Sequence, residues 1–117
     1  MTAPNIISIT SMVGKTAVQA VGISPTDIVT NSAASNKVYK INALYVSNVD
    51  GTNAATVNVD IYRSSVAYHI AKTVSIPADA TLDVLSKAIY LEEGDSLRLT
   101  ASVASDLEAV CSYEEIS

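Results

Sequence analysis

Gly14, Lys15 and Thr16 are the first residues whose types and order could do chemistry, because a Gly-Lys-Thr run ends the loop that binds phosphates in many nucleotide-binding proteins. That loop requires another glycine five positions before Gly14, and Ile9 stands there. The run is also followed by a strand-like stretch instead of the helix whose amino end would bind the phosphates. We therefore interpret Gly14-Lys15 as a turn between two strands.

His69 is the only histidine of the chain, and no Asp or Glu lies near it in the sequence. A general base needs an oriented partner, and a lone histidine does not build a metal cage. The many serines could supply a nucleophile, but the chain has no Gly-x-Ser-x-Gly elbow. We predict that the protein is not an enzyme and has no catalytic residues, and we interpret His69 as an exposed or interface residue.

Two acidic turns carry the oxygen ligands that calcium prefers: Asp50 with Asn53, and Glu92 and Glu93 with Asp95. Neither turn has the spacing of a known calcium loop. Asp and Asn beside a glycine serve the backbone of a turn, and Gly94 is suited to the left-handed conformation. We therefore expect turn chemistry at both places, with no metal and no cofactor.

The six tyrosines could line a carbohydrate site. Their scattering over five predicted strands fits packing at core edges and interfaces better: Tyr39, Tyr45, Tyr62, Tyr68, Tyr90 and Tyr113. Cys111 is the only cysteine, so the chain can form neither an intramolecular disulfide nor a zinc site of several cysteines. It falls in a predicted strand, where we expect a small buried side chain.

The composition predicts one globular domain over residues 1–117. Apolar residues make up 49% of the chain but charged residues only 16%, so we expect part of the surface to be covered in a homo-oligomer or larger assembly. The net charge of −5 argues against direct binding of nucleic acid. No apolar run is long enough to span a membrane, and the amino terminus lacks the pattern of a signal peptide.

The strongest structural signal is a predicted β-hairpin from Val38 to Arg63, where two β-rich runs flank a turn built on Asp50-Gly51. In the second run Ala55, Val57, Val59 and Ile61 alternate with Thr56, Asn58, Asp60 and Tyr62. This period of two predicts a strand with one face in the core and the other in water. Because several residues separate the runs, we expect a loop longer than two residues.

The rest of the chain predicts further short strands separated by turns at Gly22–Pro25, Ser64-Ser65, Ala78–Ala80, Glu92–Asp95 and Ser105-Asp106. The expected strands are Ile6–Val13, Thr16–Val21, Thr26–Asn31, Val66–Ile76, Thr81–Leu85, Ala88–Leu91, Ser96–Val103 and Leu107–Ile116. In Ser96–Val103 we expect Leu97, Leu99, Ala101 and Val103 to point inward and Ser96, Arg98, Thr100 and Ser102 outward. A helix over Asp79–Ala88 is the alternative. The pattern predicts an all-β, antiparallel β-sandwich or barrel.

From Leu44 onward the chain resembles small virion proteins of tailed bacteriophages. The resemblance lies in ALYVSNVDGTNAATVNVDIYR, then VSIPADATLDVL, then IYLEEGDSLRLTASVASDLEAVCSYEEI. It implies a jelly-roll-like sandwich and a capsid decoration (cement) protein that binds the major capsid protein, often as a trimer, in a virion made in the host cytoplasm. Residues 1–9 would form an arm that adds a strand to a neighbour. The alternatives are a ring-forming tail, neck or baseplate component, and a carbohydrate-binding module.

Overall fold

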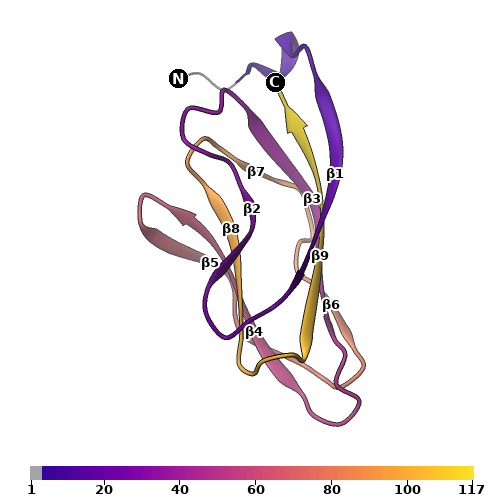
Figure 1. Ribbon diagram of the computed structural model, residues 1–117. Helices are drawn as coiled ribbons and strands as arrows, with labels where there is room; N and C mark the ends of the chain where they lie inside the picture. The colour runs from indigo at the N-terminus through magenta and orange to yellow at the C-terminus, as the bar shows by residue number, and fades with distance from the viewer. Residues whose placement is uncertain (1–3) are drawn as a thin grey trace.

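The computed structural model describes residues 4–117 as two antiparallel sheets packed face to face (Figure 1). The first sheet has the order β1 (Met12–Ala20), β9 (Leu107–Ile116), β3 (Val38–Asn48) and β6 (Thr81–Asp83), and β7 (Ile89–Leu91) pairs with the other half of β3. The second sheet has the order β2 (Thr26–Thr30), β8 (Ser96–Ala101), β4 (Ala55–Arg63) and β5 (Val66–Ile76). The prediction of an all-β antiparallel sandwich is confirmed.

The strand pairs are nested one inside another along the chain. β4 pairs with β5, β3 with β6 and β7, β2 with β8, and β1 with β9. A long antiparallel hairpin that is rolled up so that its pairs alternate between two sheets gives this order, which is the jelly roll. The terminal strands β1 and β9 therefore lie side by side in the first sheet.

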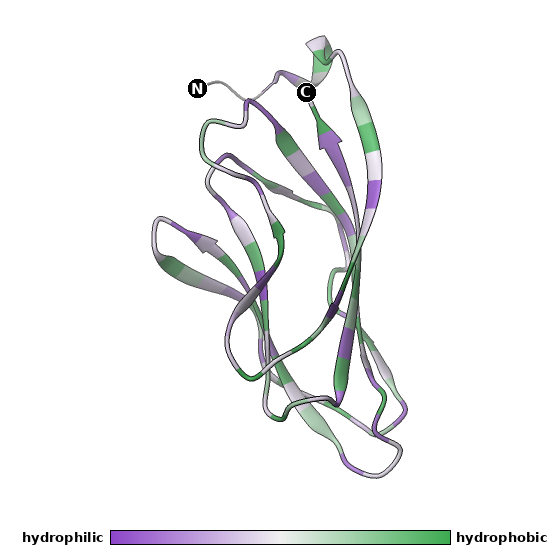
Figure 2. Cartoon of the chain, in the orientation of Figure 1, coloured by the Kyte–Doolittle hydropathy of each residue, from purple (hydrophilic) through white to green (hydrophobic). Residues whose placement is uncertain are grey.

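The core lies between the sheets, and Figure 2 shows how hydrophobic and hydrophilic residues alternate along the strands that line it. The inward residues of β3, β4 and β8 are fully or almost fully buried: Ile41, Leu44, Val46, Val57, Val59, Leu97 and Leu99. Smaller side chains come from β9, where Ala109 and Cys111 are buried. Each sheet contributes both large and small buried side chains, so the core is filled by aliphatic residues without Phe or Trp.

The amino-terminal prediction is wrong in two respects. Residues Ile6–Ser8 form a 3-10 turn, η1, which Asn5 caps by accepting a hydrogen bond from the Ile7 amide at 2.9 Å. Gly14 and Lys15 are not a turn, because β1 runs through them and pairs them with Glu114 and Tyr113 of β9. The partner strand β9 supplies a ladder of backbone hydrogen bonds, and this outweighs the preference of Gly-Lys for a turn.

The two central strands and most turns are confirmed, but the expected hairpin between these strands is wrong. β3 pairs with β9, β6 and β7 in the first sheet, and β4 pairs with β5 and β8 in the second, so the loop between them crosses from one sheet to the other. A loop of six residues joins β3 to β4, Ser64 and Ser65 adopt positive φ values between β4 and β5, and Gly94 has φ 88°. Three residues lie differently from the expectation. Val103 is 41% exposed because β8 ends at Ala101, while Ser96 and Asp60, expected in water, are buried.

The helix considered over Asp79–Ala88 does not form. A turn ends at Ala80, β6 occupies Thr81–Asp83, and the segment up to β7 is irregular. Along the described part of the chain, no helix has the length and apolar character needed to cross a membrane.

Candidate contact surfaces

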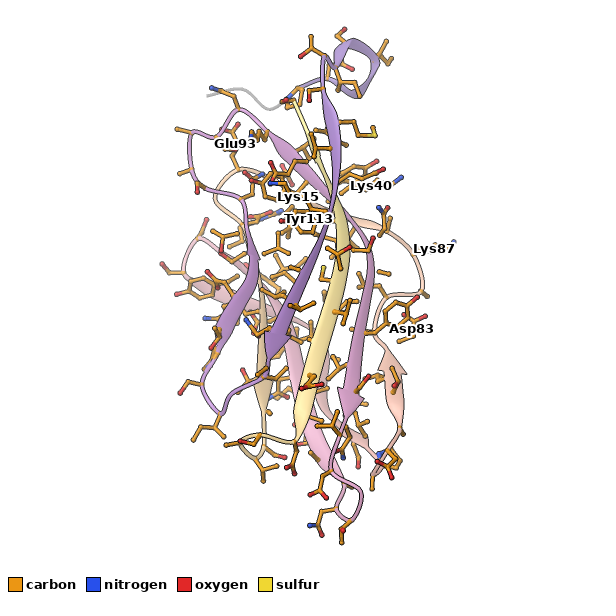
Figure 3. The ribbon with its side chains drawn as sticks, turned by 45° about the vertical axis from the view of Figure 1, so that its right-hand side comes forward. Lys15, Lys40, Asp83, Lys87, Glu93 and Tyr113 are labelled. Atoms are coloured by element: carbon orange, nitrogen blue, oxygen red, sulfur yellow. The ribbon has the colours of Figure 1, made fainter. Side chains whose placement is uncertain are left out.

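Lys15, the one cation of the Gly-Lys-Thr run, belongs to an ion-pair cluster at one end of the sandwich. Its Nζ lies 2.8 Å from Oε2 of Glu115, and Lys37 approaches the other oxygen at 3.2 Å. The hydrogen bond from Lys15 is the main cause that lowers the pKa of Glu115. Figure 3 shows Lys15 together with Tyr113, its partner across β1 and β9. This lysine is therefore engaged within the fold and is not at the end of a phosphate loop.

In the structure, a carboxylate lies on the strand next to His69, which the sequence pattern did not indicate. His69 on β5 is the register partner of Asp60 on β4. Asp60 is already bonded to Arg98, whose Nε lies 2.9 Å from Oδ1, and the Arg98 guanidinium lies 3.9 Å from the centre of the Tyr62 ring. Asp60 is thus held by Arg98 and is 2% exposed. His69 itself is exposed, in agreement with the sequence interpretation.

The acidic turn at Glu92–Asp95 is a structural anchor. Asp95 is buried and accepts hydrogen bonds from the Glu92 amide at 2.8 Å and from Nε of Arg63 at 2.7 Å. This bond to Asp95 is the main cause that raises the pKa of Arg63. Beside the turn, the buried Asn31 donates to the carbonyl oxygens of Lys37 and Leu91. Through these hydrogen bonds, the carboxylate of Asp95 connects Arg63, at the end of β4, to the turn before β8.

The other acidic turn is organised by a second buried asparagine. Asn48 donates to the carbonyl oxygens of Asn53 and Ile76 and accepts from the Asp50 amide at 3.0 Å. The Thr52 amide donates to Asp50, which lowers the pKa of Asp50, while desolvation and the charge of Asp50 raise the pKa of Asp106. Within residues 4–117, no group of three or more acidic, histidine or cysteine side chains is arranged to hold a metal ion.

The tyrosines do not gather into one platform. Arg98 covers Tyr62, and Tyr39 packs on Tyr113 with ring centres 5.7 Å apart. The tyrosines with more than two fifths of their surface exposed belong to three different strands: Tyr45 on β3, Tyr68 on β5 and Tyr90 on β7. Cys111 is fully buried in β9, as expected. The structure thus favours the packing role that the sequence predicted for these residues.

The clearest candidate surface is the outer side of the first sheet. Val18, Val110 and Tyr45 are direct register partners across β1, β9 and β3, and they are 74%, 41% and 43% exposed. A groove of about 310 Å³ lies between β1 and β9 at this level and is lined by Val18, Gln19, Ala20, Glu108, Ala109 and Val110. We call the three aligned residues the apolar row.

A second candidate surface lies on the hairpin of β4 and β5, which projects from the side of the sandwich (Figure 1). Ile61, Arg63 and Tyr68 line a pocket of about 240 Å³. Ile61 and Tyr68 are register partners, and Tyr68 is 58% exposed. We call this site the hairpin pocket.

Sequence reasoning found neither surface. Alternation along β1 or β9 shows which residues share a face, but it does not show that Val18 and Val110 meet in register. The Arg98–Asp60 pair was missed for the same reason, and Asp60 was placed in water. The sequence did carry one usable signal for the apolar row, because Val18, Val110 and Tyr45 are large apolar residues on the polar side of their strands.

No protein-family model matches the chain, and no curated protein matches it by sequence. Among solved structures, the fold is similar to a chain of the Bacillus endospore appendages, a family of disulfide-linked pili, with a TM-score of 0.55. The two are 12% identical, over 98% of this chain and 95% of the other. The fold is also similar to a chain from the acid-stable capsid of Helicobacter pylori bacteriophage KHP30, with a TM-score of 0.52 and 8% identity over 94% and 90% of the two chains.

These likenesses concern the fold. The jelly roll of this chain, over nearly its full length, is one that subunits of a pilus and of a phage capsid also use. Both of those proteins are parts of large assemblies.

Proposed function

We propose that the chain is a capsid decoration (cement) protein, which binds the outside of a phage head shell and stabilises it without catalysing a reaction. The observation that carries this proposal is the apolar row on the outer side of the first sheet. Three large apolar side chains, aligned across three strands and exposed, form an apolar surface suited to contact with a neighbouring protein. Burying such side chains contributes about 25 cal/mol for each Å² of apolar surface.

The surroundings of the apolar row support a contact with protein. Along the same face the next positions are small and uncharged: Thr16, Ser112 and Ala43. At these positions the face can approach another protein without desolvating a charge, which is costly, while Asp83, the register partner of Tyr45 on β6, places a carboxylate at the end of the apolar row. Glu108 lies on the same face of β9, two residues before Val110, whereas Ser112 lies two residues after it. The apolar row therefore has a polar rim on this side, as protein interfaces do.

A pilus subunit is the other role that the fold comparison raises. The position of Cys111 argues against a pilus in which disulfides link the copies of this chain. The chain has one cysteine, and that thiol is fully buried in β9. Burial also raises its pKa to about 11, so little thiolate forms at neutral pH. A disulfide between copies would require this strand to open. The phage-shell role requires no such change.

Binding to head shells tests the proposal. Purified protein is added to shells stripped of their outer proteins, and bound protein is measured after sedimentation, together with the temperature at which the shells break. We expect saturable binding and a higher breaking temperature. Val110→Asp should lose the binding, while Val103→Asp, at a site with the same 41% exposure in a loop, should keep it. Equal binding of both variants, or recovery of the protein on tails of disrupted virions instead of heads, would overturn the proposal.

A further inference from the structure

Ile7 is the most exposed large apolar side chain of the described residues, at 93%. It is not part of a loose tail. Asn5 caps its 3-10 turn, and the residues that follow are tied to the carboxyl end, because the amides of Thr10 and Ser11 donate to the Ser117 carbonyl oxygen at 2.8 and 2.9 Å. The fold therefore holds an isoleucine in water, at the cost of its transfer free energy.

The hairpin pocket is an apolar site that could receive such a side chain. Its residues are on the side of β4 and β5 that faces the core, but no part of the other sheet covers them. Ile61 shares its side of β4 with the buried Val57 and Val59, and Tyr68 is its partner on β5. The edge of the facing sheet is interrupted, since β6 ends at Asp83 and β7 begins only at Ile89. The pocket of about 240 Å³ is several times the ~30 Å³ that one water molecule occupies in the liquid, so it has room for an aliphatic side chain.

One side of the hairpin pocket, formed by Arg63, is held in place by hydrogen bonds. Arg63 is fixed by its bonds to Asp95 and by a further bond of its Nη2 to Glu92 at 2.9 Å. A fixed wall lowers the entropy that is lost when a side chain enters. The sequence around Ile7 adds no charge, because Asn5, Ile6, Ser8 and Ile9 are all uncharged residues, so insertion of Ile7 beside Arg63 buries no unpaired ion.

Ile7 cannot reach the hairpin pocket of its own copy. Ser11 pairs with Ser117 in line with β1, at one edge of the sandwich, and β5 is at the opposite edge of the other sheet. Three strand spacings and the gap between the sheets separate these edges by roughly 17 Å, before any offset along the strands. The three residues from Thr10 back to Ile7 span about 10 Å when fully extended. In Figure 1, η1 also lies beyond the end of β1, away from the hairpin.

We propose that Ile7 of one copy inserts into the hairpin pocket of a second copy, next to Ile61 and Tyr68. The two surfaces are different, so the contact is head-to-tail and repeats around a ring when the rotation closes. A trimer is one such closed ring. The inference goes beyond the proposed function, which uses the apolar row on another face, and its test needs no head shells. Failure of one proposal therefore leaves the other standing.

Complementary variants test the contact, with native mass measured by light scattering behind a sizing column. Wild type should be an oligomer, while Ile7→Asp and Tyr68→Asp should each be monomers. Mixing the two variants should restore a dimer and nothing larger, because one supplies an intact pocket and the other an intact Ile7. Ile23→Asp is the matched control, because Ile23 is a 64% exposed isoleucine in the loop after β1, and it should keep the wild-type mass. A monomeric wild type, an oligomeric Ile7→Asp or a mixture that stays monomeric would overturn the proposal.

Cross-linking provides a second readout in proteins that keep the wild-type surface elsewhere. Ile7→Cys and Tyr68→Cys proteins, mixed under mild oxidation, should form a disulfide-linked dimer. Ile23→Cys mixed with Tyr68→Cys should not. The native Cys111 is buried and should not react under these conditions. An oligomer that gives no Ile7→Cys to Tyr68→Cys link would contradict the assigned contact even if the protein self-associates.

Discussion

Arg98 on β8 and Asp60 on β4 form an ion pair across the outer side of the second sheet, with Nε 2.9 Å from Oδ1. The side chains are 17% and 3% exposed, so water screens the pair only weakly. The Arg98 guanidinium also lies 3.9 Å from the centre of the Tyr62 ring, a cation–π contact that holds Arg98 beside Asp60. A carboxylate on the solvent side of a strand is thereby kept almost fully buried.

The first prediction concerns this pair. Arg98→Ala should lower the free energy of unfolding by about 3 kcal/mol, because it leaves the buried Asp60 carboxylate without its partner. The measurement is urea denaturation at neutral pH. The double variant Asp60→Ala with Arg98→Ala should be less destabilised than the sum of the single variants. Additive losses would show that the two residues act independently.

The second prediction concerns the anchor at Arg63. Asp95→Ala should cost about 2 kcal/mol of unfolding free energy, since it leaves the Glu92 amide and the Arg63 guanidinium without their acceptor. The amide of Glu92 should also exchange its hydrogen faster. Glu92→Ala is the control, because it removes a carboxylate that also binds Arg63 but is 69% exposed, and such pairs contribute less than about 1 kcal/mol. Equal losses in the two variants would contradict the assigned role of burial.

The third prediction concerns the pH dependence at Glu115. Its pKa is lowered from 4.5 in the folded protein, mainly by the hydrogen bond from Lys15. The unfolded chain therefore binds a proton more readily, so the stabilisation is complete above about pH 4.5 and is lost as the pH falls through the folded pKa. The stability difference between wild type and Glu115→Gln should be largest near neutral pH and shrink toward pH 3.

The two lysines supply the control for that experiment. Lys15→Met should reduce the pH-dependent difference more than Lys37→Met, because the hydrogen bond from Lys15 is the largest single cause of the lowered pKa of Glu115. Unfolding free energies at several pH values would show the order. A difference between wild type and Glu115→Gln that is constant from pH 7 to pH 3 would contradict the ion pairing of Glu115.

The fourth prediction concerns Cys111. Burial raises the pKa of this thiol to about 11, so the native protein should react very slowly with a disulfide reagent at pH 8 and quickly in denaturant. Cys111→Ser should be less stable than Cys111→Ala, because the serine hydroxyl would need a hydrogen-bond partner among the apolar residues of the core. Fast labelling of the folded protein would show that β9 opens readily.

Sequence patterns predicted the core side of most strands correctly. The inward residues of β4 and the first three of β8 follow from alternation, because side chains of a strand point to opposite faces in turn. Turns were also predictable where the backbone demands a residue type, as at Gly94 with its positive φ. The candidate surfaces were not predictable from the sequence. A single exposed valine does not indicate a contact surface until its neighbours on the other strands are known.

The failures have physical reasons of the same kind. Gly14-Lys15 has the local chemistry of a turn, but β1 pairs with β9 over its full length and is kept extended through these residues. Asp60 has the alternation of a solvent-facing residue, but Arg98 on the neighbouring strand covers it. In both places a contact between residues far apart in the sequence overrides a local preference.

Most of the strands, their two faces and most turns follow from the amino-acid sequence alone, because these depend on the chemistry of neighbouring residues. Only the tertiary structure decided which strands pair, and so brought Val18 next to Val110, Arg98 next to Asp60 and Ile61 next to Tyr68. Strand pairing depends on how the whole hairpin rolls up and closes its core, and the period-two pattern is the same for every order of strands.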